Sequence, residues 1–367
     1  MPLDIDLDFG ITPKMPRDRS MRIGCIGSGF IMNDCHLEAY GQVGFNPYAI
    51  ASRNRAHAEA AASRHGIGVV YDSWQDLVAD PRVEILDIAI PPDLQVDVIR
   101  AAARQASHIR GIQAQKPLAM SLDDAREAVK IAADAGIALS VNSNMRYDQS
   151  MRALKSVLDR GWLGEPVLAT IEMRAIPHWQ DFLHKYSRVE LINMGIHHID
   201  AFRFLFGDPE KITCLARRDP RTQFEHIDGI TQYTFQYANG VMATSLDDVW
   251  TGPKGESDDD IYIRWRVEGT EGLAKGSIGW PKYPARTPST FAFTTKRTPK
   301  AWIAPSWDAV WFPDAFAGPM AQLMCAIEDG TEPELSGRDN LKTLACVEAC
   351  YRSIAEERTV RFDEFDL

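Results

Sequence analysis

The segment Arg22–Ile31 reads Arg-Ile-Gly-Cys-Ile-Gly-Ser-Gly-Phe-Ile, and it decides the fold of the chain. Ile23 and Ile26 belong to a short apolar run that is typical of a buried parallel strand. Gly27 and Gly29 follow at once, and a helical pattern begins a few residues later. A strand, a Gly-x-Gly turn and a helix in this order form the phosphate-binding turn of dinucleotide-binding folds. The segment therefore predicts a nucleotide site.

The two glycines have different expected roles. Gly27 would permit a tight turn, and Gly29 would let the backbone approach a pyrophosphate at the positive end of the helix. Phe30 and Ile31, the next residues of the turn, are expected to contact the same cofactor. Met32 occupies the position of the third glycine of the usual fingerprint. Because Gly-x-Gly alone also fits an ordinary strand-to-helix turn, the interpretation depends on the surrounding pattern.

Composition and charge narrow the class of protein. The chain has 367 residues, of which 45% are hydrophobic and 25% charged, which is enough for two domains with substantial cores. A net charge of −11 disfavours nucleic acid and anionic membranes as partners, and no apolar run is long enough to span a bilayer. The six cysteines are scattered without a Cys-x-x-Cys pair, which favours a reduced, cytoplasmic protein.

Residues 21–148 alternate between short apolar strands and helices. Residues 85–90 form a buried strand that ends at Pro91-Pro92, and residues 109–114 form another that ends at Gln115-Lys116-Pro117. This alternation predicts an α/β Rossmann dinucleotide-binding domain with a doubly wound parallel sheet. Residues 1–20 are expected to be an extension that lies over its own subunit, lies over a neighbouring one, or is disordered.

Residues 149–367 follow a different pattern, in which strands succeed one another with little helix between them. Ala238-Asn239-Gly240 is a hairpin turn, and one helix over residues 193–206 interrupts the strands. We expect an α+β substrate-binding and oligomerisation domain with a large, mostly antiparallel, open-faced sheet. The last two helices are expected to pack back on the first domain. Asp258-Asp259-Asp260 is either a solvated loop or a cation-binding cluster.

Several motifs, taken together and in order, resemble one known family. They are the Gly-x-Gly turn, Pro91-Pro92 after the fourth strand, Gln115-Lys116-Pro117-Leu118, Asn144-x-Arg146-Tyr147, and Gly195-Ile196-His197-His198-Ile199-Asp200. Over residues 21–362 the chain resembles the glucose–fructose oxidoreductase / inositol dehydrogenase / MocA family of NAD(P)-dependent sugar and polyol dehydrogenases. These motifs identify the family and do not choose a substrate.

The resemblance implies catalytic roles for Lys116, His197 and Asn193. Lys116 leaves the carboxyl end of a parallel strand, where such sheets bind ligands, and would hydrogen-bond the substrate hydroxyl and steady a developing alkoxide. His197 would accept the hydroxyl proton, since its reference pKa lies near 6.5. Asn193 precedes His197 by four residues and shares its helix face. Asn193 would hydrogen-bond the substrate, because an amide cannot accept a proton at neutral pH.

The neighbourhood of His197 also raises the question of a metal. His197-His198-x-Asp200 lacks the two histidines four residues apart that a helical zinc site uses, so no metal is expected. We expect Asp200 to hold its helix in place and His198 to point elsewhere.

Cofactor choice depends on the residues after the second strand. Most NAD enzymes place an acid there for the ribose hydroxyls, whereas this chain has Ser52-Arg53-Asn54-Arg55. The guanidinium groups favour a 2′-phosphate, and hence NADP by a small margin, while Ser52 and Asn54 could hold the ribose of NAD instead. The resemblance adds four further cofactor contacts, which are Pro91, Gln95, Gln115 and Asn144. Gln95 stands where many members of the family have histidine.

Substrate contacts are expected from Lys116, Asn193 and His197, by resemblance from Arg146 and Tyr147, and from Trp179 on the chemistry of its aromatic side chain. A loop-rich stretch supplies Trp179 together with His178, His184 and Tyr186, which could line a sugar pocket or pack between domains.

The resemblance implies a dehydrogenase that oxidises a monosaccharide or polyol with NAD or NADP. The best guess is an aldose, such as D-apiose, oxidised at C1 to its lactone. A glycoside hydrolase that uses bound NAD in a transient oxidation shares the scaffold, and a non-catalytic cofactor-sensing protein is a third alternative. The family pattern of sheet-to-sheet association, together with the exposed sheet face, predicts a homodimer or homotetramer.

Overall fold

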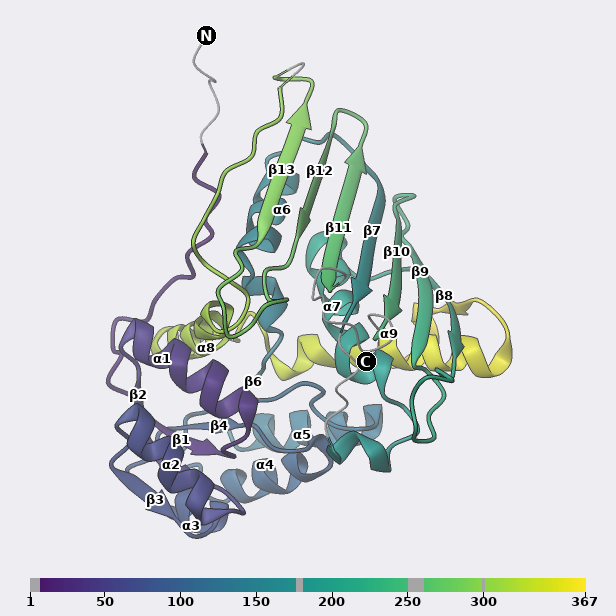
Figure 1. Cartoon of the computed structure of the whole chain (residues 1–367). Helices are drawn as coiled ribbons and strands as arrows, with labels where there is room; N and C mark the ends of the chain where they lie inside the picture. Colours follow the sequence, from purple (N-terminus) through teal and green to yellow (C-terminus); the bar gives the residue numbers. More distant parts are fainter. Residues whose placement is uncertain (1–6, 176–180, 250–260, 299–300) are drawn as a thin grey trace. The chain divides into compact units, whose positions relative to one another are not determined.

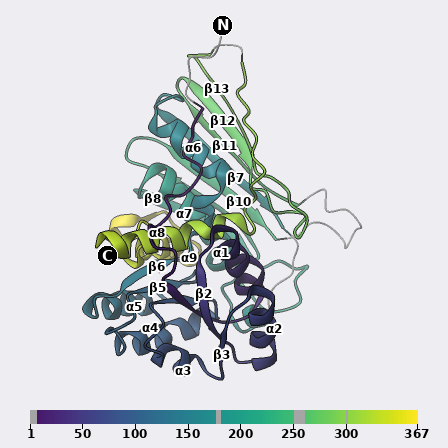
Figure 2. The same ribbon diagram turned by 90° about the vertical axis from the view of Figure 1, so that its left-hand side faces the viewer.

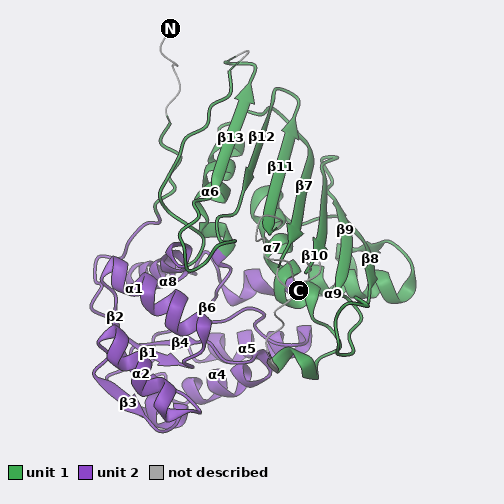
Figure 3. Cartoon of the chain, viewed as in Figure 1, with its two compact units in different colours: residues 1–12, 145–312, 345–367 green, residues 13–144, 313–344 purple. Residues whose placement is uncertain are grey.

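The computed structural model describes residues 7–175, 181–249, 261–298 and 301–367. The chain divides into two compact units, each built from separate stretches of sequence (Figure 3). The parallel-sheet unit consists of residues 13–144 and 313–344. The mixed-sheet unit consists of residues 1–12, 145–312 and 345–367. The acidic run at residues 258–260 lies outside the described residues.

The parallel-sheet unit is built on six strands in the order β3-β2-β1-β4-β5-β6, and each neighbouring pair is parallel. Every residue of β4 and β5, and all of β1 except its first residue, is buried, because layers of helix cover both faces. The strands are β1 (Arg22–Ile26), β2 (Asn46–Ala51), β3 (Val69–Tyr71), β4 (Ile85–Ile88), β5 (Gly111–Ala114) and β6 (Ala138–Val141). This is the predicted Rossmann arrangement.

The helices of the parallel-sheet unit form two layers. They are α1 (Leu37–Val43), α2 (Arg55–His65), α3 (Trp74–Ala79), α4 (Gln95–Ala103), α5 (Leu122–Asp134) and α8 (Ala317–Asp329). One side of the sheet is covered by α1, α2 and α8, which contact one another or the strands. The other side is covered by α3, α4 and α5, which pack together (Figure 2). Ser121 caps α5 by accepting the Asp124 N–H, as the Ser-x-x-Asp sequence suggests.

The mixed-sheet unit contains eight strands in the order β13-β12-β11-β7-β10-β9-β8-β14 (Figure 1). Neighbours are antiparallel except β7 and β10, so the predicted mostly antiparallel sheet is confirmed. The strands are β7 (Pro166–Arg174), β8 (Lys211–Arg217), β9 (Ile230–Gln236), β10 (Met242–Asp248), β11 (Tyr262–Gly269), β12 (Gly272–Ser277), β13 (Thr290–Thr295) and β14 (Val360–Arg361).

One face of the mixed sheet is covered and the other is open. Helices α6 (Gln149–Asp159), α7 (Ile196–Phe206) and the later residues of α9 (Gly337–Glu356) lie on the covered face (Figure 1). Alternate strand residues are buried, for example Ile212 and Cys214 in β8, while Leu215 on the other face is 70% exposed. Helix α9 crosses the division between the units, since its first residues belong to the parallel-sheet unit.

The amino-terminal segment packs on the mixed-sheet unit through Phe9. This side chain is buried and makes edge-on contacts with the rings of Trp162, Phe291, Phe293 and Trp307. Of the alternatives open for residues 1–20, residues 7–12 therefore lie on the chain's own fold.

Two helices begin differently from the regular helices predicted over residues 33–43 and 193–206. Residues Ile31–His36 and Leu191–Gly195 form short π-helical turns that continue directly into α1 and α7. Single π-helical turns occur mostly within α-helices and often at functional sites. The remaining short helices are 3₁₀ turns at Pro92–Leu94, Asn144–Tyr147, Asp181–Lys185, Asp314–Phe316 and Phe362–Glu364.

All six cysteines are buried in the structure. A search of the described helices finds none with the length and apolar character that a bilayer crossing requires.

Candidate active site

In the glycine turn after β1, one position requires glycine, and at the other an added side chain would meet open space. Gly27 has a φ of +108°, and a Cβ there would lie 2.3 Å from the carbonyl oxygen of Ala89. A Cβ on Gly29 would meet no atom within 4 Å. The structure thus has a tight turn followed by free space above Gly29, which fits the approach of a pyrophosphate to the backbone. Phe30 is 40% exposed beside this space.

The residues after β2 present hydroxyl groups and one available guanidinium group. The Ser28 hydroxyl donates to the Ser52 hydroxyl at 2.8 Å, which links the glycine turn to the end of β2. Arg55 pairs with the carboxylates of Glu59 and Asp72, whereas no carboxylate among the described residues pairs with Arg53. Of the two arginines predicted to favour NADP, Arg53 is therefore the one whose charge is available to a ligand.

Lys116 lies just beyond the carboxyl end of β5, at the same edge of the sheet as the glycine turn that follows β1. The two strands are parallel members of one sheet, so their carboxyl ends share that edge. Burial lowers the pKa of the Lys116 ammonium from 10.5 to about 8. Such a lysine is partly neutral in mildly alkaline solution.

Two predicted cofactor residues on the parallel-sheet unit have buried side chains. Gln95 is fully buried at the start of α4, and its amide hydrogen-bonds the backbone of residues 115–118. The Gln95 side chain is thus engaged with the protein backbone, and its predicted cofactor role stays a prediction. Asn144 is 2% exposed, and its amide donates to the Asn142 carbonyl at 3.5 Å. Pro91, which follows β4, is half-buried.

A buried polar cluster next to this edge was missed in the sequence. His36 Nδ1 lies 2.7 Å from Asp87 Oδ2, and the Tyr40 hydroxyl donates to the same oxygen at 2.7 Å. Asn142 Nδ2 and Gln115 Nε2 lie 2.9 and 3.4 Å from His36 Nε2. Burial, with Asp87 nearby, raises the pKa of Tyr40. A histidine one turn into a helix gives no local sign that it is buried, so only tertiary contacts reveal the cluster.

On the mixed-sheet unit, Asn193 and His197 lie on consecutive helical segments. Asn193 is half-buried in the π-helical turn, and His197 follows in the first turn of α7. The His197 side chain is 5% exposed, and its ring meets that of Trp311 edge-on at 5.4 Å. Trp311 in turn stacks on Phe312 at 4.4 Å and meets Trp280 at 6.3 Å. An aromatic cluster, in which Trp311 itself is buried, therefore adjoins the predicted proton acceptor.

Buried acids fix the segment that carries Asn193. Asp228 accepts the Val189 and Leu191 N–H groups at 2.8 and 3.0 Å, and it accepts the Tyr351 hydroxyl at 2.6 Å. Glu190 is fully buried. A Cβ added to Gly195 would lie 3.2 Å from a carboxylate oxygen of Glu190. Burial, with Asp247 nearby, raises the pKa of Glu190 well above its ordinary value. The start of this π-helical turn is thus held by side chains rather than by a regular cap.

Arg146 pairs with a carboxylate of the protein itself. Its guanidinium forms two hydrogen bonds of 2.7 Å with the Asp200 carboxylate, and both side chains are buried. This bidentate pair explains how Asp200 holds α7, as the sequence suggested. Tyr147 is 3% exposed beneath the guanidinium of Arg152. Arg146 is thus engaged by Asp200, the predicted substrate contacts of Arg146 and Tyr147 stay predictions, and Trp179 lies outside the described residues.

His198 points toward the sheet. Its Nδ1 lies 2.9 Å from Asp247 Oδ1 on β10, and both side chains are completely buried. No group of three or more potential metal-binding side chains occurs among the described residues.

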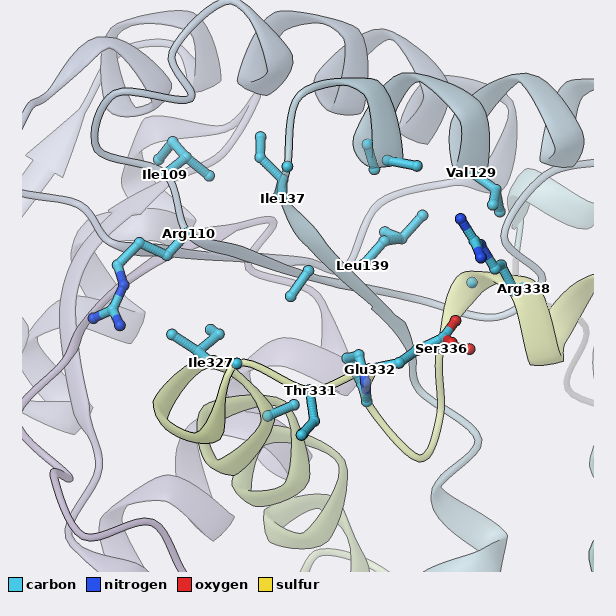
Figure 4. A pocket seen from close by; sticks show the side chains of 18 of the residues that line it. Ile109, Arg110, Val129, Ile137, Leu139, Ile327, Thr331, Glu332, Ser336 and Arg338 are labelled. Atoms are coloured by element: carbon cyan, nitrogen blue, oxygen red, sulfur yellow. The ribbon is translucent and has the colours of Figure 1, made fainter.

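The parallel-sheet unit also has a cavity of about 600 Å³ at the opposite end of its strands. It lies around the start of β6, the end of α8 and the start of α9, with Arg110, Arg338 and Ser336 among apolar side chains (Figure 4). None of the predicted site residues lines this cavity.

Comparisons with known proteins find matches along most of the chain. Residues 21–143 match the model of an oxidoreductase family with an NAD-binding Rossmann fold, and residues 151–275 match the GFO/IDH/MocA C-terminal domain. A D-apiose dehydrogenase from Paraburkholderia graminis is 28% identical over 361 residues, which cover 97% of this chain and 92% of the relative. An inositol 2-dehydrogenase from Rhizobium meliloti is 26% identical over 360 residues, which cover 93% and 99%.

A solved structure shares the whole fold. An oxidoreductase from Agrobacterium radiobacter, crystallised with NAD⁺, L-tartaric acid and magnesium, superposes with a TM-score of 0.81. The match covers 94% of this chain and 99% of that one at 24% sequence identity. At this identity the likeness supports the fold.

Proposed function

Since the chain belongs to the GFO/IDH/MocA family of NAD(P)-dependent oxidoreductases, we propose that it oxidises a hydroxyl group of a monosaccharide or polyol. The observation that carries this proposal is the position of Lys116 at the carboxyl edge of the parallel sheet, the edge that also bears the open turn at Gly29. A buried ammonium at that edge can hydrogen-bond an alcohol oxygen and stabilise negative charge that develops on it. The D-apiose and inositol dehydrogenases among the relatives support a sugar or polyol as substrate.

The residues of the glycine turn fit a dinucleotide. Gly27 and Gly29 would hold the pyrophosphate, with Phe30 and Ile31 beside it, and Ser52 and Arg53 would bind the adenosine ribose. When bound, the nicotinamide supplies the hydride-accepting carbon. Arg53 favours the 2′-phosphate of NADP by a small margin, because its charge has no carboxylate partner among the described residues.

Each proposed catalytic residue has a distinct task. His197 Nε2 or Nδ1 would accept the hydroxyl proton, Lys116 would donate a hydrogen bond to the same oxygen, and Asn193 would orient the substrate. The buried aromatic cluster around Trp311 would exclude water from His197. The proposed substrate is an aldose such as D-apiose, with C1 oxidation to the lactone.

The open face of the mixed sheet supports a homodimer or homotetramer. Leu168 and Met242 pair in register on β7 and β10, and Leu215 lies on the same face of β8. These side chains are 37%, 45% and 70% exposed. Association with a second copy would remove these apolar side chains from water. Light scattering tests this directly, and a monomeric mass would contradict it.

The function is tested with purified protein, NAD⁺ or NADP⁺, and a panel of aldoses, branched pentoses and inositols, by following reduced-nicotinamide absorbance. We expect reduction with one sugar, a loss of at least roughly 100-fold in kcat for His197→Ala, and unchanged kcat for His108→Ala at the other end of the sheet. Release of a sugar without net cofactor reduction would instead identify a glycoside hydrolase. Binding of the cofactor without turnover of any substrate would favour the sensing protein.

A further inference from the structure

The segment that carries Lys116 has backbone groups that no strand satisfies. Residues 115–118 follow the end of β5, with Gln115 and Lys116 half-buried and Pro117 and Leu118 buried. Pro117 has no N–H group. Buried carbonyl and N–H groups that leave a sheet need other hydrogen-bonding partners, because leaving one unsatisfied costs about 1–3 kcal/mol.

A single side chain supplies most of those partners. Gln95 Oε1 accepts the Gln115 N–H at 2.7 Å, and Gln95 Nε2 donates toward the Gln115 and Pro117 carbonyls at 2.9 and 2.8 Å. The Leu118 carbonyl lies 3.3 Å from the same nitrogen. Gln95 therefore binds the backbone immediately before and immediately after Lys116. Only a side chain with both a donor and an acceptor at its tip can do this.

A second group of side chains holds the same segment from another direction. Gln115 Oε1 accepts the N–H of Lys116 at 2.9 Å, and Gln115 Nε2 lies 3.4 Å from His36 Nε2. His36 belongs to the turn that leads into α1, which covers one face of the sheet, whereas Gln95 belongs to α4 on the other face. The peptide units around Lys116 are thus held from both layers of helix.

We infer that Gln95 is a positioning residue for Lys116, which fixes where the ammonium group projects at the carboxyl edge of the sheet. This inference rests on the proposed function of Lys116. Gln95 touches no reacting atom, and it acts through the two peptide units on either side of the lysine. Its loss would let the segment shift and admit water, so the lysine would be both misplaced and better solvated.

The test compares Gln95→Leu, which removes donor and acceptor, with Gln95→His, which retains one of each. Gln322→Leu is a matched control, because Gln322 also uses both its donor and its acceptor in the same unit, donating to the Ser140 hydroxyl and the Pro319 carbonyl and accepting the Leu335 N–H. Competitive acylation of the cofactor-free protein, followed by mass spectrometry across pH, measures the reactivity of the Lys116 amine. Steady-state kinetics and nucleotide titration are measured in parallel.

For Gln95→Leu we expect kcat to fall roughly 10- to 100-fold while nucleotide affinity changes less than about 3-fold. The Lys116 acylation profile should move to higher pH, and Gln95→His should recover a substantial part of both properties. Gln322→Leu should leave both unchanged. Should Gln95→Leu fail to fold, the isosteric Gln95→Glu, which lacks the donors, replaces it.

A lower melting temperature for Gln95→Leu, with kcat and the Lys116 acylation profile unchanged, would overturn the inference and leave Gln95 with a structural role alone. The acylation readout needs neither substrate nor cofactor. If the wild type oxidises no sugar, the proposed function fails, yet the acylation profiles still decide whether Gln95 positions Lys116.

Discussion

Replacement of Lys116 by methionine should make the protein more stable while removing its activity. Burial lowers the pKa of the Lys116 ammonium from 10.5 to about 8. At pH 7 the lysine is protonated in both the folded and the unfolded state, so the folded protein bears the cost of the buried charge. The difference between these two pKa values corresponds to about 3 kcal/mol. Methionine has a similar length and no charge, so Lys116→Met should raise the free energy of unfolding by about that amount.

The difference in stability between Lys116→Met and the wild type should depend on pH. Between pH 8 and 10.5 the folded protein has released the Lys116 proton while the unfolded chain retains it, so wild-type stability rises relative to the variant. The advantage of Lys116→Met should therefore shrink to about 1 kcal/mol at pH 9.5. Urea unfolding followed by tryptophan fluorescence at pH 7 and pH 9.5 measures both differences.

Lys130→Met serves as the control, because this exposed lysine on α5 forms a surface ion pair with Asp134. Its effect should be less than about 0.5 kcal/mol at either pH. If Lys116→Met is no more stable than the wild type at pH 7, or if its advantage is the same at pH 9.5, the buried-charge reasoning is wrong.

Three further predictions address other parts of the molecule. Gly29→Ala should leave stability unchanged, since its Cβ meets open space, yet weaken nucleotide binding roughly tenfold in a fluorescence titration. Arg146→Met should lower the free energy of unfolding by about 3 kcal/mol, and adding Asp200→Leu should recover part of that loss, as measured by urea unfolding. Phe9→Ala should cost about 3 kcal/mol in the same assay, whereas Leu7→Ala, which is 46% exposed in the wild type, should cost little. Equal effects of the last two variants would show that the aromatic contacts of Phe9 contribute nothing.

Local sequence signals predicted the architecture well because they act over a few residues. Apolar runs closed by glycine or proline marked the parallel strands, and the Asn239-Gly240 turn marked a hairpin between β9 and β10. The turn at Gly27 follows from a positive φ and a close carbonyl, both of which only glycine tolerates. The residues that such turns and strand ends require stand at the turn or strand end itself, so the local sequence reveals them.

The partners of buried polar side chains could not be predicted in the same way. Arg146 and Asp200 are far apart in the sequence, and an arginine beside a conspicuous motif looks the same whether it binds substrate or a carboxylate. Nothing in the local sequence marks Gln95 and His36 as buried, and the folded chain surrounds both. The π-helical turn at residues 191–195 depends on Asp228, which contacts it from a distant stretch of sequence. Such contacts arise only from the tertiary fold.

The parallel-sheet unit takes its last stretch, residues 313–344, from long after residue 144. Within that stretch Ile327 lies against Gly111 on β5, and Leu335 accepts the Val141 N–H at the edge strand β6. A ribosome adding about 5–20 residues per second needs roughly 10–40 s to cover this interval. During that time the nascent Rossmann sheet lacks α8 and leaves the apolar faces of β5 and β6 uncovered. This apolar surface is therefore covered only once the ribosome has completed residue 344.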